Sequence, residues 1–414
     1  MGLILRIALT HLCHRKRQTL VSVFGVAMGV GFFIGMAALM QGFQSYFVSK
    51  IIDVWPHIVV KDEFRNPSLQ PASRSYPDGA VKIHSVKPLE ELRGIRDGKA
   101  VVEALNRMQG VHAAPTLRTQ AFMRFGAKDV SSTLVGIDTD RERDVSHLER
   151  DLIAGKLASL HTTANGVILG EGLAGKLGAQ MGDTLSVISP AGVIVKMEVA
   201  GIFRSGITTI DNFEAYCLIK DAQILANRPN VINQIRIRLA DVEWARDTAR
   251  VIETRYGYRS ESWEETYENV LGIFVIQNGI MYSTVSAILI VAAFGIFNII
   301  STIIHEKTRD IAILRSIGLE ERDIRVIFLL EGLIVGMVGT LLGWALGHGI
   351  VELLASIRFK VEGFVRSEGF ILNEHVGQYL LAAGFALAAS SLAAFLPARK
   401  AAKLKPVDII RGAG

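Results

Sequence analysis

The feature that most constrains this chain is a set of four long stretches without a single Asp, Glu, Lys or Arg, at residues 18–49, 269–305, 332–351 and 375–398. A bilayer core about 30 Å thick is spanned by roughly 20 apolar residues in a helix. Each stretch reaches that length, and buried helices of soluble proteins rarely run so far without a charged face. The sequence therefore predicts four transmembrane helices rather than a soluble core.

The basic residues flank these stretches unevenly, and this predicts the orientation of the chain. Segment 1–17 carries Arg and Lys but no acid, and the segment after the fourth stretch is also basic. Because cytoplasmic flanks are enriched in Lys and Arg, we expect both termini in the cytoplasm and a multi-pass protein of the bacterial inner membrane. Segment 50–268 is nearly balanced in charge, so the net charge of +5 is not a nucleic-acid signal.

The predicted fold class is an α-helical membrane protein with four transmembrane helices, one plus three, and a large mixed α/β extracytoplasmic domain inserted between the first and second. The predicted parts are a cytoplasmic amphipathic segment (1–17), helix 1 (18–49), the periplasmic domain (50–268), a stalk with helix 2 (269–305), a cytoplasmic coupling loop (306–325), helix 3 (326–351), a periplasmic loop (352–374), helix 4 (375–398) and a cytoplasmic tail (399–414).

Two of the predicted helices carry glycines at four-residue spacing, which places small residues on one face and lets helix backbones approach closely. We expect these faces to pack within a bundle or a dimer. The helix-packing candidates are Gly25, Gly29, Gly31, Gly35, Gly339, Gly343 and Gly347. The second stretch would be on the order of 55 Å long as a helix, so it is expected to extend beyond the bilayer.

The segment 50–268 has the patterns of a mixed α/β domain. Strands are predicted at 57–61, 121–124, 184–189, 193–202 and 235–239, and helices within 89–108 and at 171–177 and 242–256. Ser189-Pro-Ala-Gly192 is typical of a hairpin turn. Residues 64–88 have four prolines and predict a surface excursion.

Known catalytic and metal-binding patterns are absent, so we predict no catalytic residue and no metal site. Gly170-Glu-Gly-Leu-Ala-Gly-Lys176 nearly matches a phosphate-binding loop, but Leu177 stands where that loop needs Ser or Thr. His11, Cys13 and His14 crowd together on a basic amphipathic segment without an obvious carboxylate partner. An interfacial helix is the favoured interpretation of that segment over a metal site.

Glu331 is the one carboxylate close to the interior of a predicted span. An intramembrane acid is a candidate for a proton or substrate relay. The other interpretation, which we favour, is a carboxylate near the interface that pairs with an Arg or caps a neighbouring helix.

The segment between the second and third spans predicts a short amphipathic helix under the membrane. Ile311, Leu314 and Ile317 fall on one helical face, and Gly318 follows as a C-cap. Acids at 320–323 are placed to begin the next helix. An amphipathic helix of this kind suits docking into a groove of a cytosolic partner.

This segment resembles the coupling helix of ABC-superfamily permeases of the MacB, FtsX and LolC/LolE type. Residues 306–318 follow the family run E-[KR]-x-x-[DE]-I-[AG]-[IV]-L-[RK]-x-[IL]-G. The segments 397–402 with 406–408, and 167–174 with 181–183, are similar to the closing motif and the outer domain of that family. Length and the short inner loop are most similar to the lipoprotein-releasing LolC and LolE subunits.

The resemblance implies a non-catalytic subunit of an ATP-driven translocase, with ATP and Mg²⁺ bound by a separate ATPase dimer and no cofactor on this chain. The implied partners are that ATPase, a second permease subunit in a homodimer or heterodimer, a lipid or lipoprotein cargo, and a periplasmic carrier or adaptor, but no nucleic acid. The implied ATPase-coupling residues are Glu306, Arg309, Asp310, Ile311, Leu314, Arg315, Ile317 and Gly318. Cargo-path candidates are Phe32, Met36, Met40, Ile276 and Met281.

Three functions share these inner parts: lipoprotein release, MacB-like export of small amphiphiles or peptides through an adaptor and an outer-membrane channel, and FtsX-like mechanotransmission to a periplasmic enzyme. One departure separates the chain from LolC. The LolC-type hook that captures a periplasmic carrier lies between two strands, and here Ser189-Pro-Ala-Gly192 leaves only a tight turn.

Overall fold

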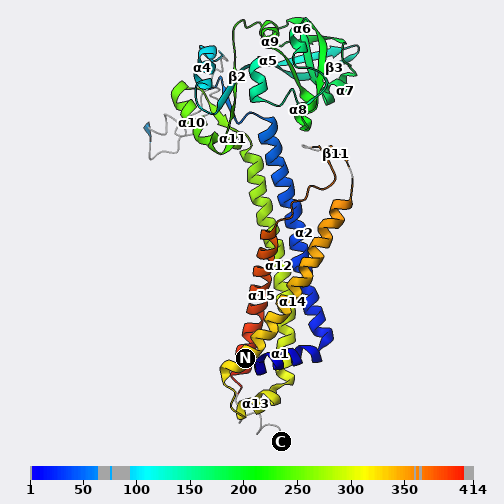
Figure 1. Cartoon of the computed structure of the whole chain (residues 1–414), viewed down its shortest axis with the longest axis vertical. Coiled ribbons are helices and arrows are strands. Elements are labelled where there is room, and N and C mark those ends of the chain that lie inside the picture. Colours follow the sequence, from blue (N-terminus) through cyan, green and yellow to red (C-terminus); the bar gives the residue numbers. More distant parts are fainter. Residues whose placement is uncertain (1, 64–74, 77–93, 359, 363–365, 405–414) are drawn as a thin grey trace. The chain divides into compact units, whose positions relative to one another are not determined.

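The computed structural model of the chain describes residues 2–63, 75–76, 94–358, 360–362 and 366–404 (Figure 1). Contacts divide it into two compact units. The helical unit comprises 1–46, 272–360 and 367–414, and the sheet unit comprises 47–271 and 361–366. The predicted excursion at 64–88 and the end of the basic tail lie outside the described residues, apart from 75 and 76.

In the described residues the helical unit is built on four long apolar helices, with one short helix before the first of them and another between the second and the third. The long helices are α2 (Lys16–Val54), α12 (Glu268–Glu306), α14 (Glu321–Ser356) and α15 (Val376–Ala402), and the short ones are α1 (Gly2–His14) and α13 (Thr308–Ser316). All four long helices are long and apolar enough to cross a membrane, and each contains or nearly contains one charge-free stretch. Helix α15 continues past Pro397, where the sequence alone predicted the fourth span to end.

Glycine rows let α2 lie against α14 at close range. Val26, Val30 and Ile34 of α2 face Gly339, Gly343 and Gly347 of α14, and a Cβ placed on Gly343 would lie 2.5 Å from the Val30 Cβ. In return Gly31 and Gly35 receive Leu346 and Ile350, while Gly25 and Gly29 receive Ala292 and Leu289 of α12. The predicted small-residue faces are therefore used for packing within this one chain.

The start of α14 shows how local sequence sets a helix boundary. Gly318 has a φ of 116°, a left-handed conformation that ends the preceding segment, and the Leu319 N–H donates to the Leu314 carbonyl. Glu320 then forms a capping box with Asp323, in which each side chain accepts from the other's backbone N–H. The predicted stop at Gly318 and the acidic start at 320–323 are both confirmed.

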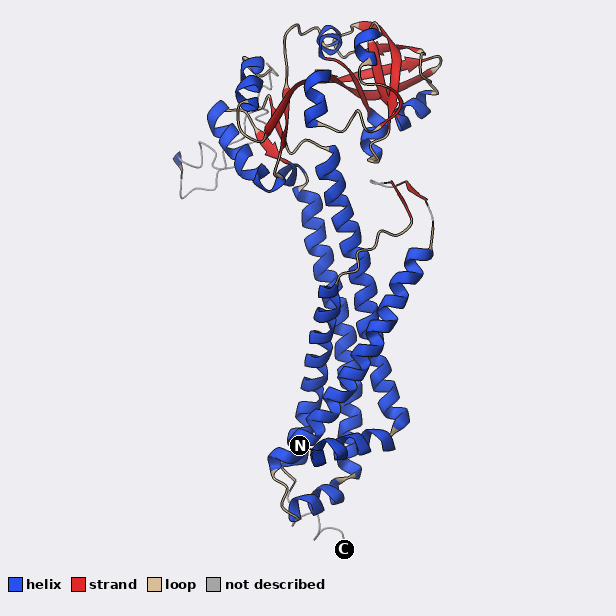
Figure 2. Cartoon of the chain, viewed as in Figure 1, coloured by secondary structure: helices blue, strands red, loops and turns tan. Residues whose placement is uncertain are grey.

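The described part of the sheet unit contains one ten-stranded mixed sheet, whose strands are drawn red in Figure 2. The strand order is β10-β1-β9-β2-β3-β8-β5-β7-β4, with β6 pairing both β2 and β7. The β3–β8 and β5–β7 pairs are parallel and the others antiparallel. The strands are β1 (Ile58–Lys61), β2 (Val111–Phe125), β3 (Lys128–Ile137), β4 (Leu152–Gly155), β5 (Gly166–Gly170), β6 (Thr184–Ile188), β7 (Ile194–Phe203), β8 (Glu214–Leu218), β9 (Gln234–Leu239) and β10 (Ser260–Ser262). A separate pair is formed by β11 (Lys360–Glu362) and β12 (Arg366–Glu368).

Short helices cover this sheet, and the cores they enclose are aliphatic. Strand β5 is buried along its whole length, as expected for a strand with a parallel neighbour inside a sheet. The helices are α4 (Gly98–Asn106), α5 (Thr139–Val145), α6 (Ser159–Thr162), α7 (Glu171–Leu177), α8 (Thr208–Phe213), α9 (Ile219–Leu225), α10 (Ala245–Tyr256) and α11 (Trp263–Thr266), with a 3₁₀ turn η1 (Val242–Trp244).

Two local predictions in this unit are confirmed by its backbone. Residues 189–193 close the β6–β7 hairpin, with Ile188 opposite Ile194 and Gly192 at a φ of 79°. The near-match to a phosphate loop is the β5–α7 connection, where the helix begins at once at Glu171. Lys176 therefore lies in the last turn of α7, over the Phe213 ring, instead of at the helix start where a phosphate-binding lysine stands.

Candidate functional site

The candidate coupling site is α13, the short helix between α12 and α14. Its inner face belongs to the core of the helical unit, because Ile311 is 2% exposed and Leu314 packs against that core. Its outer face carries Ile313 and Ile317, which is 74% exposed. The predicted docking face therefore divides. Ile311 and Leu314 hold the helix in place, and Ile317, joined by the unpredicted Ile313, is free to meet another protein.

Charged side chains connect α13 and the end of α12 to the rest of the helical unit. Glu306, the last residue of α12, pairs with Arg15, just before α2. Lys307 Nζ lies 2.7 Å from the Asp310 carboxylate within the coupling segment. Arg315 donates to the Ala402 carbonyl at 3.1 Å at the end of α15. Arg309 has no ion-pair partner among the described residues. Among the predicted coupling residues, Arg315 therefore joins α13 to α15, and Glu306 joins the end of α12 to the start of α2.

Glu331 lies inside the helical unit with no exposed surface, and α1 provides its partner. The His11 Nδ1 lies 2.8 Å from Glu331 Oε1, and Glu331 Oε2 has no hydrogen-bond partner among the described residues. The sequence-based expectations of an Arg partner for Glu331, and of no carboxylate for His11, are corrected by this pair. Its role is to attach the amphipathic α1 to α14.

The five cargo-path candidates do not share one environment. Phe32 and Ile276 are exposed, Met36 and Met40 are half-buried against the core, and Met281 is 2% exposed. Met281 therefore packs inside the helical unit and does not offer a surface to cargo. The exposed α12 surface around Ile276 also includes Ile273, Val275 and Ile280.

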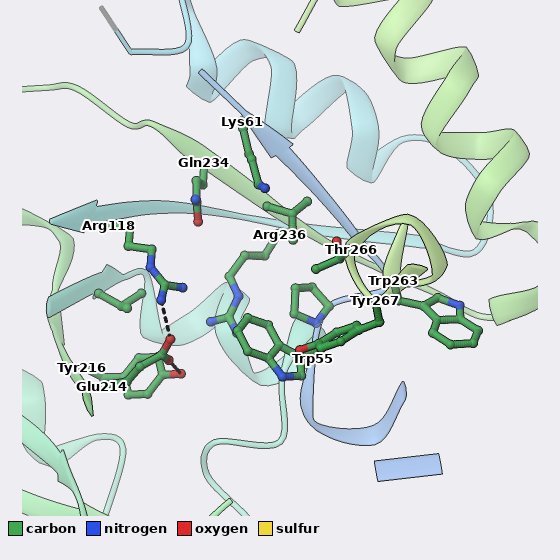
Figure 3. Close-up of a pocket in the computed structure, with 13 residues that line it drawn as sticks. Trp55, Lys61, Arg118, Glu214, Tyr216, Gln234, Arg236, Trp263, Thr266 and Tyr267 are labelled. Carbon is green, nitrogen blue, oxygen red and sulfur yellow. Dashed lines mark hydrogen bonds and ion pairs between the residues drawn. The ribbon is translucent and has the colours of Figure 1, made fainter. Parts of the chain in front are cut away.

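A pocket in the sheet unit was not found from the sequence. We call it the aromatic pocket: its floor is one face of the sheet, with Lys61, Arg118, Glu214 and Arg236, and its cover includes Trp55 and Trp263 (Figure 3). A usable signal was present in β9, where Arg236 and Arg238 alternate with Ile235 and Ile237. Period-two alternation places both arginines on one face, opposite the aliphatic core.

Arg236 and Glu142 form a buried ion pair beneath this pocket, with 2.7 Å between Arg236 Nη1 and Glu142 Oε1. Burial opposes the charge of Arg236, but the neighbouring Glu142 carboxylate outweighs it and raises the Arg236 pKa above its ordinary value. Burial raises the pKa of Tyr216, so its hydroxyl stays protonated and donates to Glu214 Oε2 at 3.0 Å. The floor thus combines the cations of Lys61, Arg118 and Arg236 with the Glu214 carboxylate and the neutral Tyr216 hydroxyl.

No group of three or more His, Cys, Asp or Glu side chains that could hold a metal occurs in the part of the chain that the structure describes. Cys13 is exposed and Cys217 is buried, and both are free thiols. Burial raises the pKa of Cys217 well above its ordinary value, so this thiol is unreactive.

Comparison with known families connects these features. Residues 19–255 match the family described as MacB-like periplasmic core domain, and residues 282–406 match the one described as FtsX-like permease C-terminal. The chain belongs to the FtsX-like and MacB-like permease family. Most of the sheet unit lies within the first match, and α14 and α15 lie within the second.

Similar proteins place this permease among ABC transporter permeases. It is 27% identical over 433 residues to the lipoprotein-releasing system transmembrane protein LolC of Neisseria meningitidis serogroup B, covering 98% of each chain. It is 24% identical over 410 residues to the LolE protein of Haemophilus influenzae, covering 94% of this chain and 93% of that one. A macrolide export ATP-binding/permease protein MacB of Hyphomonas neptunium is 26% identical over 414 residues, and the match covers 94% of this chain and 58% of that protein.

Proposed function

We propose that this permease is the transmembrane subunit of an ABC transporter that extracts lipoproteins or other lipid-anchored cargo from the inner membrane. ATP and Mg²⁺ would act on a partner ATPase dimer, and this chain would convert the ATPase movement into movement of the sheet unit. The observation that carries the coupling role is α13, which presents Ile313 and Ile317 outward while Ile311 fastens it to the bundle.

The proposed cargo rests on the extent of the likeness to LolC, which spans 98% of both chains. The proposed second permease subunit is supported by α12. Only 33% of its apolar 18-residue segment is buried within this chain. A helix that leaves most of its apolar surface uncovered is suited to contact lipid, cargo or a neighbouring subunit in the membrane.

The proposed orientation has both termini in the cytoplasm and the sheet unit in the periplasm. Arg6, Arg15, Lys16 and Arg17 lie at the start of the helical unit, and Arg399, Lys400 and Lys403 lie at the end of α15. This excess of cations at both ends of the helical unit supports a cytoplasmic location for both termini and for α13.

The tight β6–β7 turn favours a second candidate function. Only residues 189–193 separate the two strands, so the described part of the sheet unit has no room there for a carrier-binding hook. Export of a small amphiphile or peptide with an adaptor and an outer-membrane channel would not need such a hook. FtsX-like mechanotransmission to a periplasmic enzyme uses the same coupling helix and differs only in the periplasmic partner.

The coupling role is tested by replacing Ile317 with Asp in the tagged full chain and purifying the complex from native membranes. The substitution removes an apolar contact and places a carboxylate in an interface that excludes water. We therefore expect about tenfold or greater loss of the co-purifying ATPase, quantified by mass spectrometry. Ile224→Asp is the matched control, since Ile224 is 61% exposed on α9 of the sheet unit. Undiminished ATPase recovery with Ile317→Asp would contradict the assignment.

A further inference from the structure

The aromatic pocket is a built cavity of about 280 Å³ whose walls come from two sources. Its floor crosses neighbouring strands β1, β9, β2, β3 and β8, and the register sets Val59 opposite Arg236 and Arg118 opposite Val135. Its cover is formed by residues just after α2, beginning with Trp55, and just before α12, ending with Tyr267 (Figure 3).

The Arg118 guanidinium supplies hydrogen-bond donors to the wall of the pocket. Arg118 donates one of its five N–H groups to Glu214 Oε1 at 2.7 Å, and Tyr216 occupies the other Glu214 oxygen. The remaining N–H groups of Arg118 favour a ligand that supplies acceptor oxygens, because hydrogen bonds between a guanidinium and an anionic group are among the strong ones.

Positively charged side chains on the walls also favour a ligand with acceptor oxygens. Lys61, Arg118 and Arg236 line the cavity, and Glu214 is its only lining carboxylate among the described residues. The carboxylates that pair with Arg236 and Lys61, those of Glu142 and Glu261, do not line it. The surface that a bound molecule would meet is therefore cationic.

Aromatic faces supply the rest of the recognition. The Trp55 and Tyr267 rings meet edge to face with centroids 6.2 Å apart, beside Pro56 and Val59. A cavity of this volume is at the lower end of the range for small-molecule sites, which are about 300–1,000 Å³, so it suits one small molecule and not a two-chain lipid.

We propose that the aromatic pocket binds a small anion with an apolar body, held through one carboxylate or one phosphate monoester. The acidic group accepts hydrogen bonds from Arg118 and lies close to the charge of Lys61, and the apolar body lies against Trp55 and Tyr267. This site stands on the sheet unit alone and does not depend on the coupling role of α13.

Occupancy of the pocket has a structural consequence. Trp55 directly follows the last residue of α2, and Tyr267 directly precedes the first residue of α12. The backbone N–H of Trp263 already donates to the His57 carbonyl at 2.9 Å and links the two connections. A ligand that contacts both sides adds to this link, so backbone amides near 55–57 and 263–267 exchange more slowly when it is bound.

The test is a titration of the full chain in lipid nanodiscs by isothermal calorimetry, with empty nanodiscs as the blank. Three probes of similar shape are compared: 4-phenylbutyrate, phenyl phosphate and the neutral 4-phenylbutanamide. We expect one or both acids to bind and the amide to bind about tenfold more weakly or worse, because hydrogen bonds to a charged group contribute about 1.5–3 kcal/mol. The acid that binds more tightly shows whether the pocket prefers a carboxylate or a phosphate monoester.

Variants locate the binding in this pocket. Trp55→Ala removes one aromatic face of the pocket, and Lys61→Gln removes a cation whose partner Glu261 is still paired with Arg259. Arg118→Gln removes the main donor, while Arg118→Lys restores the charge. We expect each loss variant to weaken binding of the acid, by about tenfold for Arg118→Gln. Trp244→Ala, at a 62% exposed indole outside the pocket, is the matched control and is expected to bind normally.

The proposal is overturned by any of three results: neither acid binds above the blank, the amide binds as tightly as the acids, or Trp55→Ala, Lys61→Gln and Arg118→Gln all bind as the unmodified chain does. Hydrogen exchange separates a local effect from unfolding, because a folded variant keeps protection in β2 and β3. The ATPase co-purification described above is unaffected by the Trp55 and Lys61 variants, so failure here leaves the coupling assignment standing.

Discussion

At the scale of single residues, the His11–Glu331 pair is a buried polar contact inside the helical unit. A carboxyl group with no exposed surface has one oxygen hydrogen-bonded to His11 and the other without a partner among the described residues. Removing the imidazole leaves the first oxygen unsatisfied as well, which costs about 1–3 kcal/mol. The pair therefore attaches α1 to α14 more firmly than the apolar contacts of a 13-residue helix would alone.

We predict that His11→Ala lowers the thermal unfolding midpoint of the chain in nanodiscs, and that adding Glu331→Gln recovers part of the loss because an amide is less costly to bury without the histidine than a carboxyl group is. His14→Ala is the control, since His14 is exposed on the same helix. A double variant less stable than His11→Ala alone would show that Glu331 contributes independently of His11.

His57 gives the sheet unit a dependence on pH. The Leu239 N–H donates to His57 Nδ1 at 3.1 Å, and burial, followed by the charge of Arg238, lowers the His57 pKa below its ordinary 6.5. Burial also lowers the pKa of His147, which accepts from Arg238. Because the unfolded chain binds a proton more readily, this stability is complete above 6.5 and is lost as the pH falls from there through the folded pKa values.

We predict that the thermal unfolding midpoint of the sheet unit decreases when the pH is lowered from about 7.5 to about 5.5. We also predict that His57→Asn makes this decrease smaller. The Asn side chain keeps an acceptor for the Leu239 N–H but does not titrate. Differential scanning fluorimetry at the two pH values measures the effect. Equal losses in the variant and the unmodified chain would show that His57 is not responsible.

At the scale of elements, the contact of α2 with α14 depends on the absence of side chains at Gly339, Gly343 and Gly347. We predict that Gly343→Ala destabilises the helical unit by about 1–3 kcal/mol, because its methyl group would meet Val30 at 2.5 Å in a packed interface. Gly349→Ala is a control on the same helix, where nothing lies within 4 Å. A midpoint for Gly343→Ala as high as that of Gly349→Ala would contradict the packing argument.

The elements also show what the sequence could predict and why. The long helices, the glycine faces and the stop at Gly318 were predictable because hydropathy, small-residue spacing and capping are local signals. Strands β5 and β8 were missed because they are buried on both faces and lack the alternation that marks a strand. Ile311 was assigned to a docking face because helical periodicity identifies an apolar stripe but not what covers it.

Contacts between distant parts of the chain were the least predictable. His11 and Glu331 are 320 residues apart, and Trp55 and Trp263 meet at one pocket only because two connections of the sheet unit lie side by side. Motif spacing carries no information about such pairs. The buried ion pair of Arg236 with Glu142 belongs to the same class.

At the scale of the whole molecule, different parts of the chain have different proposed roles. One chain provides apolar helices, a coupling helix and a sheet unit, and it shares its family with permeases named for lipoprotein release and macrolide export. The likeness to LolC over nearly the full length favours lipid-anchored cargo, and the short β6–β7 turn leaves amphiphile export as the alternative. Only a direct measurement of transport separates the two.

That measurement is the release of a labelled lipoprotein from proteoliposomes that contain this chain and its co-purified ATPase. Our account predicts that lipoprotein leaves the vesicles only when ATP and Mg²⁺ are added, that Ile317→Asp abolishes release, and that Ile224→Asp leaves it unchanged. Lipoprotein that stays with the vesicles while the ATPase is active, or that leaves equally without ATP, would contradict it.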